Sequence, residues 1–129
     1  MAITDSRANV LVAIVDDDRS VLGSLENLLR STGHRVAGFS SGPAFLASGI
    51  LAETCCLILD LQMPEMSGHE VFELVAARHP VPVIVITAHG DDPVRARMLR
   101  DGAVAFFTKP FRAAEILAAV RAAVKREDG

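Results

Sequence analysis

The stretch CCLILDLQMPEMSG, residues 55–68, decides how this chain folds. Its first part, from Cys55 to Leu59, is an unbroken apolar run, which is typical of a strand that is covered on both faces. The run stops at the carboxylate of Asp60, and Pro64 and Gly68 then indicate a turn. This stretch therefore predicts a buried strand that ends on a charged side chain.

Other apolar runs of strand length flank this central one. They are VLVAIV (10–15), RVAGF (35–39), VPVIVIT (81–87) and AVAFFTK (103–109), with CCLILD (55–60) as the third of five. Most are nearly continuous and rich in β-branched or aromatic residues, which again predicts strands with both faces covered.

Segments with helical spacing lie between these runs. An apolar stripe from Val21 to Leu29 ends at Gly33, and Ser67 with Glu70 has the spacing of a capping box. The remaining helix signals are Ser41 before Pro43 for a second helix, Asp92 and Pro93 as the N-cap and first residue of a fourth helix that ends near Gly102, and Ile116, Leu117, Val120 and Val124 for a fifth.

The alternation of strands and helices predicts right-handed crossovers and an α/β fold. We therefore expect a doubly wound, five-stranded parallel sheet with helices on both faces. The length of 129 residues fits one domain. The predicted organisation is a flexible N-terminus over residues 1–9, one domain over 10–125 and a C-terminal tail over 126–129.

Composition narrows the possible functions. The net charge is −3 and the lysines and arginines are scattered, which argues against direct nucleic acid binding by this chain. No apolar run reaches the ~18 residues that span a bilayer, and the N-terminal residues lack the basic and apolar regions of a signal peptide. We expect a cytoplasmic protein without membrane contact.

Polar residues stand at the predicted carboxyl ends of four strands, and the ligand site of a doubly wound sheet lies at this edge. They are Asp16, Asp17 and Asp18 after the first strand, Asp60 at the end of the third, Thr87 at the end of the fourth and Lys109 at the end of the fifth. Taken alone, Asp18 is explained as a helix cap and Lys109 as a solvated lysine. Their joint placement favours a functional site.

The chemistry of this predicted cluster points to phosphoryl transfer. Carboxylates brought to ~5 Å repel each other by about 3 kcal/mol per pair at an effective dielectric of ~20, so the cluster needs a cation. Oxygen ligands suit Mg²⁺. Asp60 is then equipped to attack a phosphoryl group, because the metal, Lys109 and Thr87 meet the charge that develops on its oxygens.

Four separated motifs in this order and spacing resemble the receiver domain of two-component response regulators, a CheY-like superfamily, over nearly the whole chain. They are VDDDRSV (15–21), LDLQMPEMSGHE (59–70), VITAH (85–89) and FFTKPF (106–111). The residues in and around the second and third motifs are most similar to those of FixJ-type receivers, which commonly precede a LuxR-type DNA-binding domain. The resemblance implies a flavodoxin-like fold with strand order 2-1-3-4-5. We expect an excised receiver or a single-domain regulator.

The resemblance also implies roles for individual residues. Asp60 accepts a phosphoryl group from a sensor histidine kinase or a histidine phosphotransfer protein, so the chain is a signalling receiver that catalyses only its own phosphorylation and dephosphorylation. The other implied roles are Mg²⁺ binding by Asp17, Asp60 and the backbone carbonyl of Gln62, with Asp16 acting through water; phosphate binding by Lys109, whose bond to Pro110 is usually cis; and switching by Thr87 and Phe106.

Two further expectations concern regulation. Gln62 and His89 occupy positions that influence autodephosphorylation in the family, so we hypothesise that they set the lifetime of the phosphoryl group. The scatter of the four histidines disfavours a metal site, and His34, His69 and His79 are predicted to lie at the surface. The surface of the fourth helix, fifth strand and fifth helix is expected to control an output or partner, with homodimerisation strengthened by phosphorylation.

Other classes of protein remain as alternatives. A haloacid dehalogenase-like aspartyl-phosphate hydrolase also uses an aspartate at a strand end with Mg²⁺, but it carries a second carboxylate two residues later, where this chain has Gln62. A flavodoxin-like nucleotide-binding module would need a GxGxxG motif or a P-loop, and both are absent. A pseudo-receiver that serves only as a scaffold is disfavoured by the complete Asp, Thr and Lys set.

Overall fold

The structure is a computed structural model that describes residues 10–128, with side chains described as far as residue 125. The strands are β1 (Leu11–Val15), β2 (Arg35–Phe39), β3 (Thr54–Asp60), β4 (Val83–Thr87) and β5 (Ala105–Thr108). The helices are α2 (Arg19–Ser31), α3 (Gly42–Ala47), α4 (Gly68–Arg78), α5 (Asp92–Arg100) and α6 (Ala113–Asp128), and a short 3₁₀ helix η1 (Ile50–Glu53) precedes β3.

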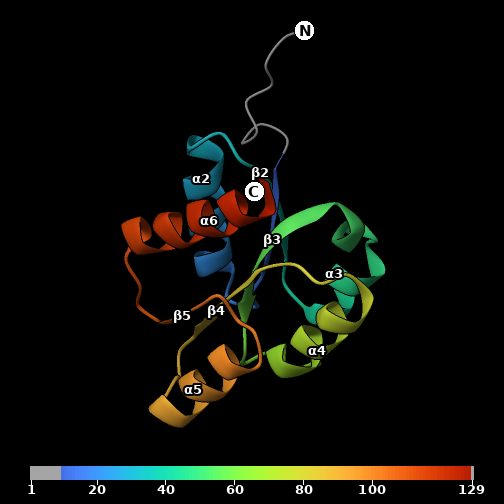
Figure 1. Cartoon of the computed structure of the whole chain (residues 1–129), viewed down its shortest axis with the longest axis vertical. Helices are drawn as coiled ribbons and strands as arrows, with labels where there is room; N and C mark the ends of the chain where they lie inside the picture. Colours follow the sequence, from blue (N-terminus) through green and yellow to red (C-terminus); the bar gives the residue numbers. More distant parts are fainter. Residues whose placement is uncertain (1–9, 129) are drawn as a thin grey trace, which may run out of the picture.

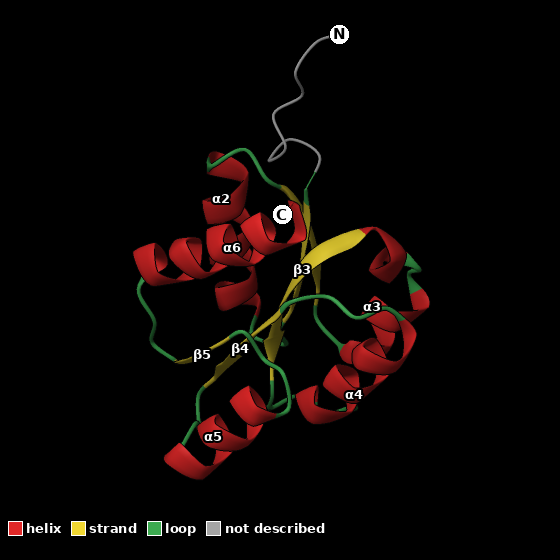
Figure 2. Ribbon diagram, viewed as in Figure 1, coloured by secondary structure: helices red, strands yellow, loops and turns green. Residues whose placement is uncertain are grey.

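The five strands form one parallel sheet in the order β2-β1-β3-β4-β5, as the sequence predicts. Helices α2 and α6 cover one face, and α3, α4 and α5 cover the other (Figure 1). Strands and helices alternate along the chain throughout (Figure 2). The doubly wound α/β fold is therefore confirmed.

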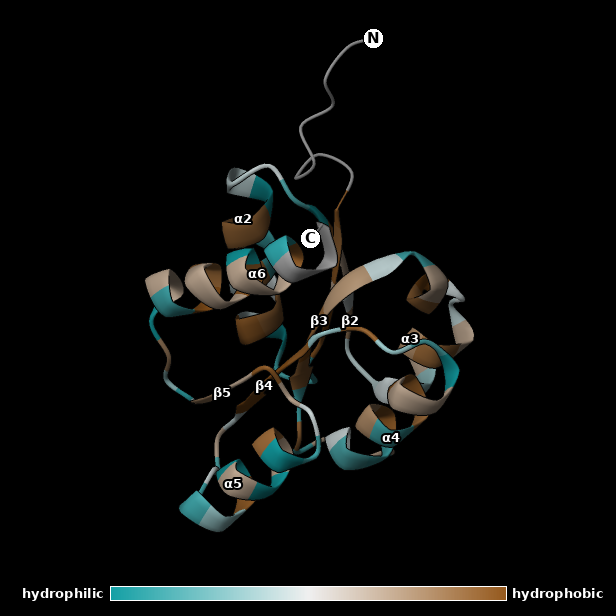
Figure 3. Ribbon diagram, in the orientation of Figure 1, coloured by the Kyte–Doolittle hydropathy of each residue, from teal (hydrophilic) through white to brown (hydrophobic). Residues whose placement is uncertain are grey.

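Strand β3 lies at the centre of the sheet and contributes to the core on both faces. Leu57 and Leu59 belong to the cluster under α3, α4 and α5, whereas Cys56 and Ile58 belong to the cluster under α2 and α6. Much of the sheet is accordingly hydrophobic in colour (Figure 3). Because each fully buried large apolar side chain contributes about 1.5–3 kcal/mol, this central strand is a rigid support for the residue at its end.

Most helix boundaries follow the predicted caps. The Ser67 side chain accepts a hydrogen bond from the Glu70 N–H at 3.3 Å and starts α4. Gly33 follows the end of α2 with a φ of 89°, a left-handed conformation that glycine adopts without strain. The prediction for α5 was wrong by one residue: the cap is Asp91, which accepts from Val94 N at 3.0 Å, so Asp92 begins the helix.

Some predicted boundaries differ from the structure. The strand predicted over 81–87 begins at Val83, and the one predicted over 103–109 is confined to Ala105–Thr108. Helix α6 extends to Asp128, and the predicted flexible segment 1–9 lies outside the described residues. The expectation of a surface position for His34 was wrong, because this side chain is buried and its Nδ1 lies 2.9 Å from Thr32 Oγ1. Within residues 10–128, none of the helices has the length and apolarity needed to cross a bilayer.

Candidate functional site

The predicted site residues meet at the carboxyl edge of the sheet. Asp16 directly follows β1, Asp60 ends β3, Thr87 ends β4 and Lys109 directly follows β5. Three of these four, Asp16, Asp60 and Thr87, are buried, although the sheet edge is where loops begin. The register explains the convergence, since Asp60 pairs with Ile86 in β4 and the next residue of β4 is Thr87.

Asp16, Asp17 and Asp60 form an acidic cluster in which one carboxylate oxygen from each residue lies within 4.8 Å of the other two. Asp16 is fully buried, Asp60 is 2% exposed and Asp17 is exposed, so the cluster opens to solvent on the side of Asp17. The Asp18 side chain is used elsewhere: it accepts from Ser20 N at 2.9 Å and caps α2. The interpretation of Asp18 as a helix cap is therefore confirmed.

The turn after Asp60 packs closely against its backbone. The Gln62 N–H donates to Asp60 Oδ1 at 3.2 Å, and the Gly68 N–H donates to the Leu61 carbonyl at 2.9 Å. A Cβ atom on Gly68 would collide with the Asp60 carbonyl and lie 2.5 Å from Leu61 Cα. Only glycine lets the chain return this closely, so Gly68 holds α4 directly against the strand end that carries Asp60.

Lys109 connects the carboxylates from the opposite side. Its Nζ is 2.9 Å from Asp16 Oδ2 and 3.5 Å from Asp60 Oδ2. The backbone of Lys109 is held by a hydrogen bond, because its N–H donates to the Thr87 carbonyl at 2.8 Å. The Lys109–Pro110 peptide bond is cis, as the family resemblance implies. The ammonium group thus lies between the ends of β1 and β3.

The electrostatics of the cluster are dominated by burial and by the proximity of like charges. Burial, and next the negative charge of Asp16, raise the pKa of Asp60 to about 6, while the Gln62 N–H and Lys109 oppose this rise. Burial by itself would lower the pKa of Lys109, but its hydrogen bond to Asp16 and the charges of Asp16 and Asp60 together raise it. Lys109 therefore remains an ammonium, and its charge does not fully compensate the carboxylates.

This arrangement fits a divalent cation. The donor set consists of oxygen atoms from three carboxylates, which hard divalent cations prefer. The raised pKa of Asp60 means that ionising the whole cluster has a free-energy cost, which an additional positive charge would remove. The predicted metal residues Asp16, Asp17 and Asp60 are thus brought together, and Gln62 follows them with an exposed side chain.

The remaining predicted residues surround the cluster. Thr87 is buried, and its Oγ1 accepts a hydrogen bond from His89 N at 3.3 Å. The His89 side chain is exposed. Phe106 is 4% exposed and packs in the core on the α5 side of the sheet. Gly90 and Arg95 both contact Phe106, but neither was predicted from the sequence as a site residue. The one feature of the sequence that could have indicated them is the glycine three residues after Thr87.

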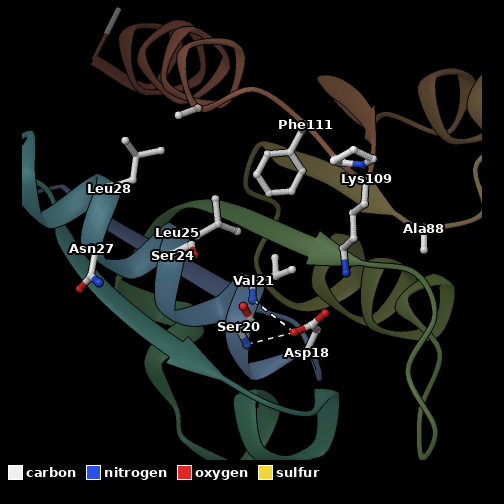
Figure 4. A pocket seen from close by; sticks show the side chains of 12 residues that line it. Asp18, Ser20, Val21, Ser24, Leu25, Asn27, Leu28, Ala88, Lys109 and Phe111 are labelled. Atoms are coloured by element: carbon white, nitrogen blue, oxygen red, sulfur yellow. Dashed lines mark hydrogen bonds between the residues drawn. The ribbon is translucent and has the colours of Figure 1, made fainter.

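A groove adjoins the cluster beside Lys109, between α2 and the segment that follows β5 (Figure 4). Val21, Leu25 and Leu28 line it from α2, and Phe111 lines it from the opposite side. Ser20 and Lys109 place polar groups at the same groove. An apolar surface therefore lies next to the lysine whose ammonium group contacts the carboxylates of Asp16 and Asp60.

Comparisons with known proteins show the family to which this chain belongs. Residues 12–121 match the family described as the response regulator receiver domain. The chain is 47% identical over 116 residues to the response regulator protein TmoT of Ectopseudomonas mendocina, covering 89% of this chain and 53% of TmoT. It is 41% identical over 116 residues to the transcriptional regulatory protein FixJ of Azorhizobium caulinodans, covering 89% of this chain and 55% of that protein. The crystal structure of FixJ-N superposes with a TM-score of 0.78 at 36% identity, covering 95% of this chain and 96% of that one.

The chain spans about half the length of the curated relatives it matches. The family match extends over both the acidic residues after β1 and the lysine after β5, so it includes every strand end that builds the site. The expected resemblance to FixJ-type receivers is confirmed, and nothing in the comparisons supports a haloacid dehalogenase-like hydrolase. The chain belongs to the receiver domain family of two-component response regulators.

Proposed function

We propose that this domain accepts a phosphoryl group on Asp60 from a phosphorylated histidine of a sensor kinase or a histidine phosphotransfer protein, in a Mg²⁺-dependent reaction. The observation that carries the proposal is the position of Asp60: a carboxylate at the end of the central strand, 3.5 Å from the Lys109 ammonium and within 4.8 Å of two other carboxylates. Family membership adds support, because receiver domains partner with histidine kinases. As such a signalling domain, it would act in the cytoplasm.

In the proposed step, an ionised Asp60 oxygen forms a bond to phosphorus while the bond between phosphorus and the donor imidazole nitrogen breaks. The electron pair of that bond leaves with the imidazole, and the carboxylate becomes an acyl phosphate. Hydrolysis later returns Asp60 and releases inorganic phosphate. The chain's own residues hold the acceptor oxygen in place, since the Gln62 N–H fixes one Asp60 oxygen at 3.2 Å and the strand fixes the backbone.

Lys109 and Thr87 would stabilise the charge on the transferred oxygens. Lys109 remains an ammonium because Asp16 raises its pKa, and its Nζ already lies beside Asp60. Thr87 carries a hydroxyl at the adjacent strand end, where it is buried. Groups that are held in position before the reaction need no reorganisation during it, which is why they lower the barrier.

Asp16, Asp17, Asp60 and the backbone carbonyl of Gln62 are the groups that would hold the metal ion. When bound, Mg²⁺ would supply positive charge that neutralises the carboxylates and the phosphoryl oxygens. Asp17, as the exposed carboxylate, gives the cluster its contact with solvent.

The groove beside Lys109 is the proposed docking site for the phosphodonor protein. Asp60 is almost completely buried, so a donor histidine must approach from a surface that adjoins it. The groove offers the half-buried apolar side chains Val21, Leu28 and Phe111 for contact, and it reaches Lys109. Replacement of Leu28 by Glu should therefore slow transfer from the partner protein while leaving phosphorylation by a small donor unchanged.

The surface formed by α5, β5 and α6 is proposed to carry the signal to an output domain or a second copy of the chain. Leu99 on α5 is 38% exposed, and Phe107 on β5 is half-buried. A phosphorylation-dependent homodimer requires this surface to bind more tightly in the phosphorylated state. Sedimentation that stays unchanged on addition of a phosphoryl mimic would contradict dimerisation through this surface.

Incubation with acetyl phosphate and Mg²⁺, followed by intact mass measurement, tests the central proposal. We expect a mass gain of one phosphoryl group that is absent in Asp60→Asn and absent without Mg²⁺. Steady turnover of varied phosphoesters, or an equal mass gain in Asp60→Asn, would contradict it.

A further inference from the structure

Phe106 is held by two residues that lie outside the acidic cluster. Its ring is buried on the α5 side of the sheet, in the cluster that contains Val85 and Met98. Gly90, in the loop between β4 and α5, lies against the ring, and Arg95, in α5, contacts both the ring and the backbone. These contacts come from one short segment that begins three residues after Thr87.

Gly90 provides space for the Phe106 ring. A Cβ atom at this position would lie 2.7 Å from Cε1 and Cζ of Phe106 and 2.9 Å from Cγ2 of Thr87. The glycines with positive φ in the described residues are Gly33, Gly49 and Gly102, so the Gly90 backbone has a conformation that alanine can adopt. The requirement for glycine is therefore the close approach of the ring, which fills the volume that a Cβ would occupy.

Arg95 contacts Phe106 through two different groups. Its Nη1 donates a hydrogen bond to the Phe106 carbonyl at 3.3 Å. Its guanidinium carbon lies 6.0 Å from the centroid of the Phe106 ring, at the outer limit of a cation–π contact. Arg95 lies in the first turn of α5, and Phe106 lies in β5. The contact between them therefore links the start of this helix to the strand.

We propose that Gly90 and Arg95 are positioning residues that stabilise Phe106 in the buried position described above, which we call the inward conformation. They would thereby set the fraction of molecules with an inward ring before phosphorylation. The inference rests on the proposed function, in which Thr87 and Phe106 would act as the switch pair that the family resemblance implies. In a two-state equilibrium, a contact made in one state alone shifts the populations by its own free energy. The two residues would thereby determine the basal signal of the receiver and the size of its response.

The same contacts should strengthen the binding of a phosphoryl mimic at Asp60. If a phosphoryl group on Asp60 favours the inward ring, the inward ring must favour the phosphoryl group to the same extent, because coupling between two sites is reciprocal. Loss of the Arg95 contacts would then lower the apparent affinity for a phosphoryl mimic by the factor by which the inward population falls.

The experiment compares Arg95→Gln with Arg97→Gln in the full chain. Arg97 is an arginine of the same helix, exposed, and 3.8 Å from Asp101, and residues two apart on a helix do not share a face. Ring resonances of labelled phenylalanine, with Phe106 assigned through Phe106→Leu, report the inward population without any phosphodonor. Titration with beryllium fluoride and Mg²⁺ reports the coupling to the site.

We expect Arg95→Gln to reduce the ratio of inward to outward Phe106 by ~3-fold or more and to weaken beryllium fluoride binding by a similar factor. Arg95→Lys, which keeps a charged donor, should restore part of both effects, and Arg97→Gln should show neither. Gly90→Ala should move the ring outward because the added methyl group occupies its place. Should Gly90→Ala not fold, the comparison of the two arginines decides the question.

Identical Phe106 resonances in Arg95→Gln and the native chain would overturn the inference, as would equal shifts in Arg95→Gln and Arg97→Gln. This result is separable from the proposed function. The ring populations are measured without a phosphodonor, whereas failure of Asp60 phosphorylation would appear in the mass measurement of the native chain.

Discussion

Lys109 lies nearer to Asp16 than to the proposed phosphoacceptor Asp60: its Nζ is 2.9 Å from Asp16 Oδ2 and 3.5 Å from Asp60 Oδ2. Asp16 is fully buried, so this ammonium compensates a carboxylate that water does not reach. The lysine therefore has a structural role in the resting domain in addition to its proposed contact with a phosphoryl group.

Lys109→Met should destabilise the domain as well as impair phosphorylation. The substitution keeps most of the side-chain volume but leaves Asp16 and Asp60 without a positive partner, and removing one member of a buried ion pair costs about 3–5 kcal/mol. We expect a loss of about 2–4 kcal/mol in the free energy of unfolding, measured by urea denaturation without divalent cations. Lys109→Arg, which keeps the charge, should lose less; equal losses in both variants would rule out a charge effect.

The stability of the metal-free protein should fall as pH rises through the titration of Asp60. Its pKa is about 6 in the folded state and 3.8 in the unfolded chain, so the folded state binds more protons between these values and ionisation of Asp60 opposes folding above about pH 6. Asp60→Asn removes this penalty. We expect the variant to be more stable than the native chain at pH 7, by roughly 1–2 kcal/mol after allowance for solvent screening, and to lose that advantage below about pH 4.

Urea denaturation at several pH values checks this prediction, with Asp101→Asn as the control because Asp101 is exposed. Parallel pH profiles for the native chain and Asp60→Asn would show that Asp60 does not carry the effect.

Magnesium binding should depend on Asp17 and be insensitive to Asp18. The Asp17 carboxylate belongs to the cluster, whereas that of Asp18 caps α2, a role that asparagine fills equally well. Asp17→Asn should weaken Mg²⁺ binding at least about tenfold in calorimetric titration, and Asp18→Asn should leave it near the native value. Because the cation competes with protons for Asp60, affinity should also fall as the pH drops below about 6. Equal affinity in the two variants would exclude the cluster as the metal site.

Gly68→Ala should distort the turn that holds Asp60. The added Cβ would meet the Asp60 carbonyl and Leu61 Cα, which are backbone atoms of the central strand end and cannot move aside cheaply. We expect a loss of at least about 2 kcal/mol in the free energy of unfolding and slower phosphorylation by acetyl phosphate. Gly23→Ala is the matched control, since a Cβ there has nothing within 4 Å and should stabilise α2 by about 0.5–1 kcal/mol. Similar effects from both substitutions would refute the proposed close contact.

The lifetime of the phosphoryl group should respond to Gln62 and His89. Both side chains are exposed, and they follow two residues after Asp60 and Thr87 respectively. Gln62→Ala keeps the backbone carbonyl and N–H, so a change in decay rate would come from the side chain. The rate is measured by loss of phosphoprotein mass after removal of the donor; unchanged decay in both Gln62→Ala and His89→Ala would remove them from this role.

The fold was predictable because the buried strands appear in the sequence as nearly continuous apolar runs. Both faces of β3 are buried, so its residues are apolar throughout, and the change to Asp60 marks its end without ambiguity. Helix starts were less certain where two suitable caps are adjacent: Asp91 and Asp92 both fit the pattern, and the three-dimensional path of the loop selected Asp91. His34 shows the same limit, since a turn position next to a glycine gave no indication that the imidazole would be buried.

The sequence by itself determined the parallel α/β fold, the set of polar residues at the strand ends and their gathering at one edge of the sheet, because strand ends of a parallel sheet necessarily meet there. Only the tertiary structure decided how these residues pair. It brought the Lys109 ammonium closer to Asp16 than to Asp60, assigned Asp18 to a helix cap, and brought Gly90 and Arg95 into contact with Phe106. Contacts between segments far apart in the chain depend on packing distances of a few tenths of an ångström, and no local pattern of residues encodes them.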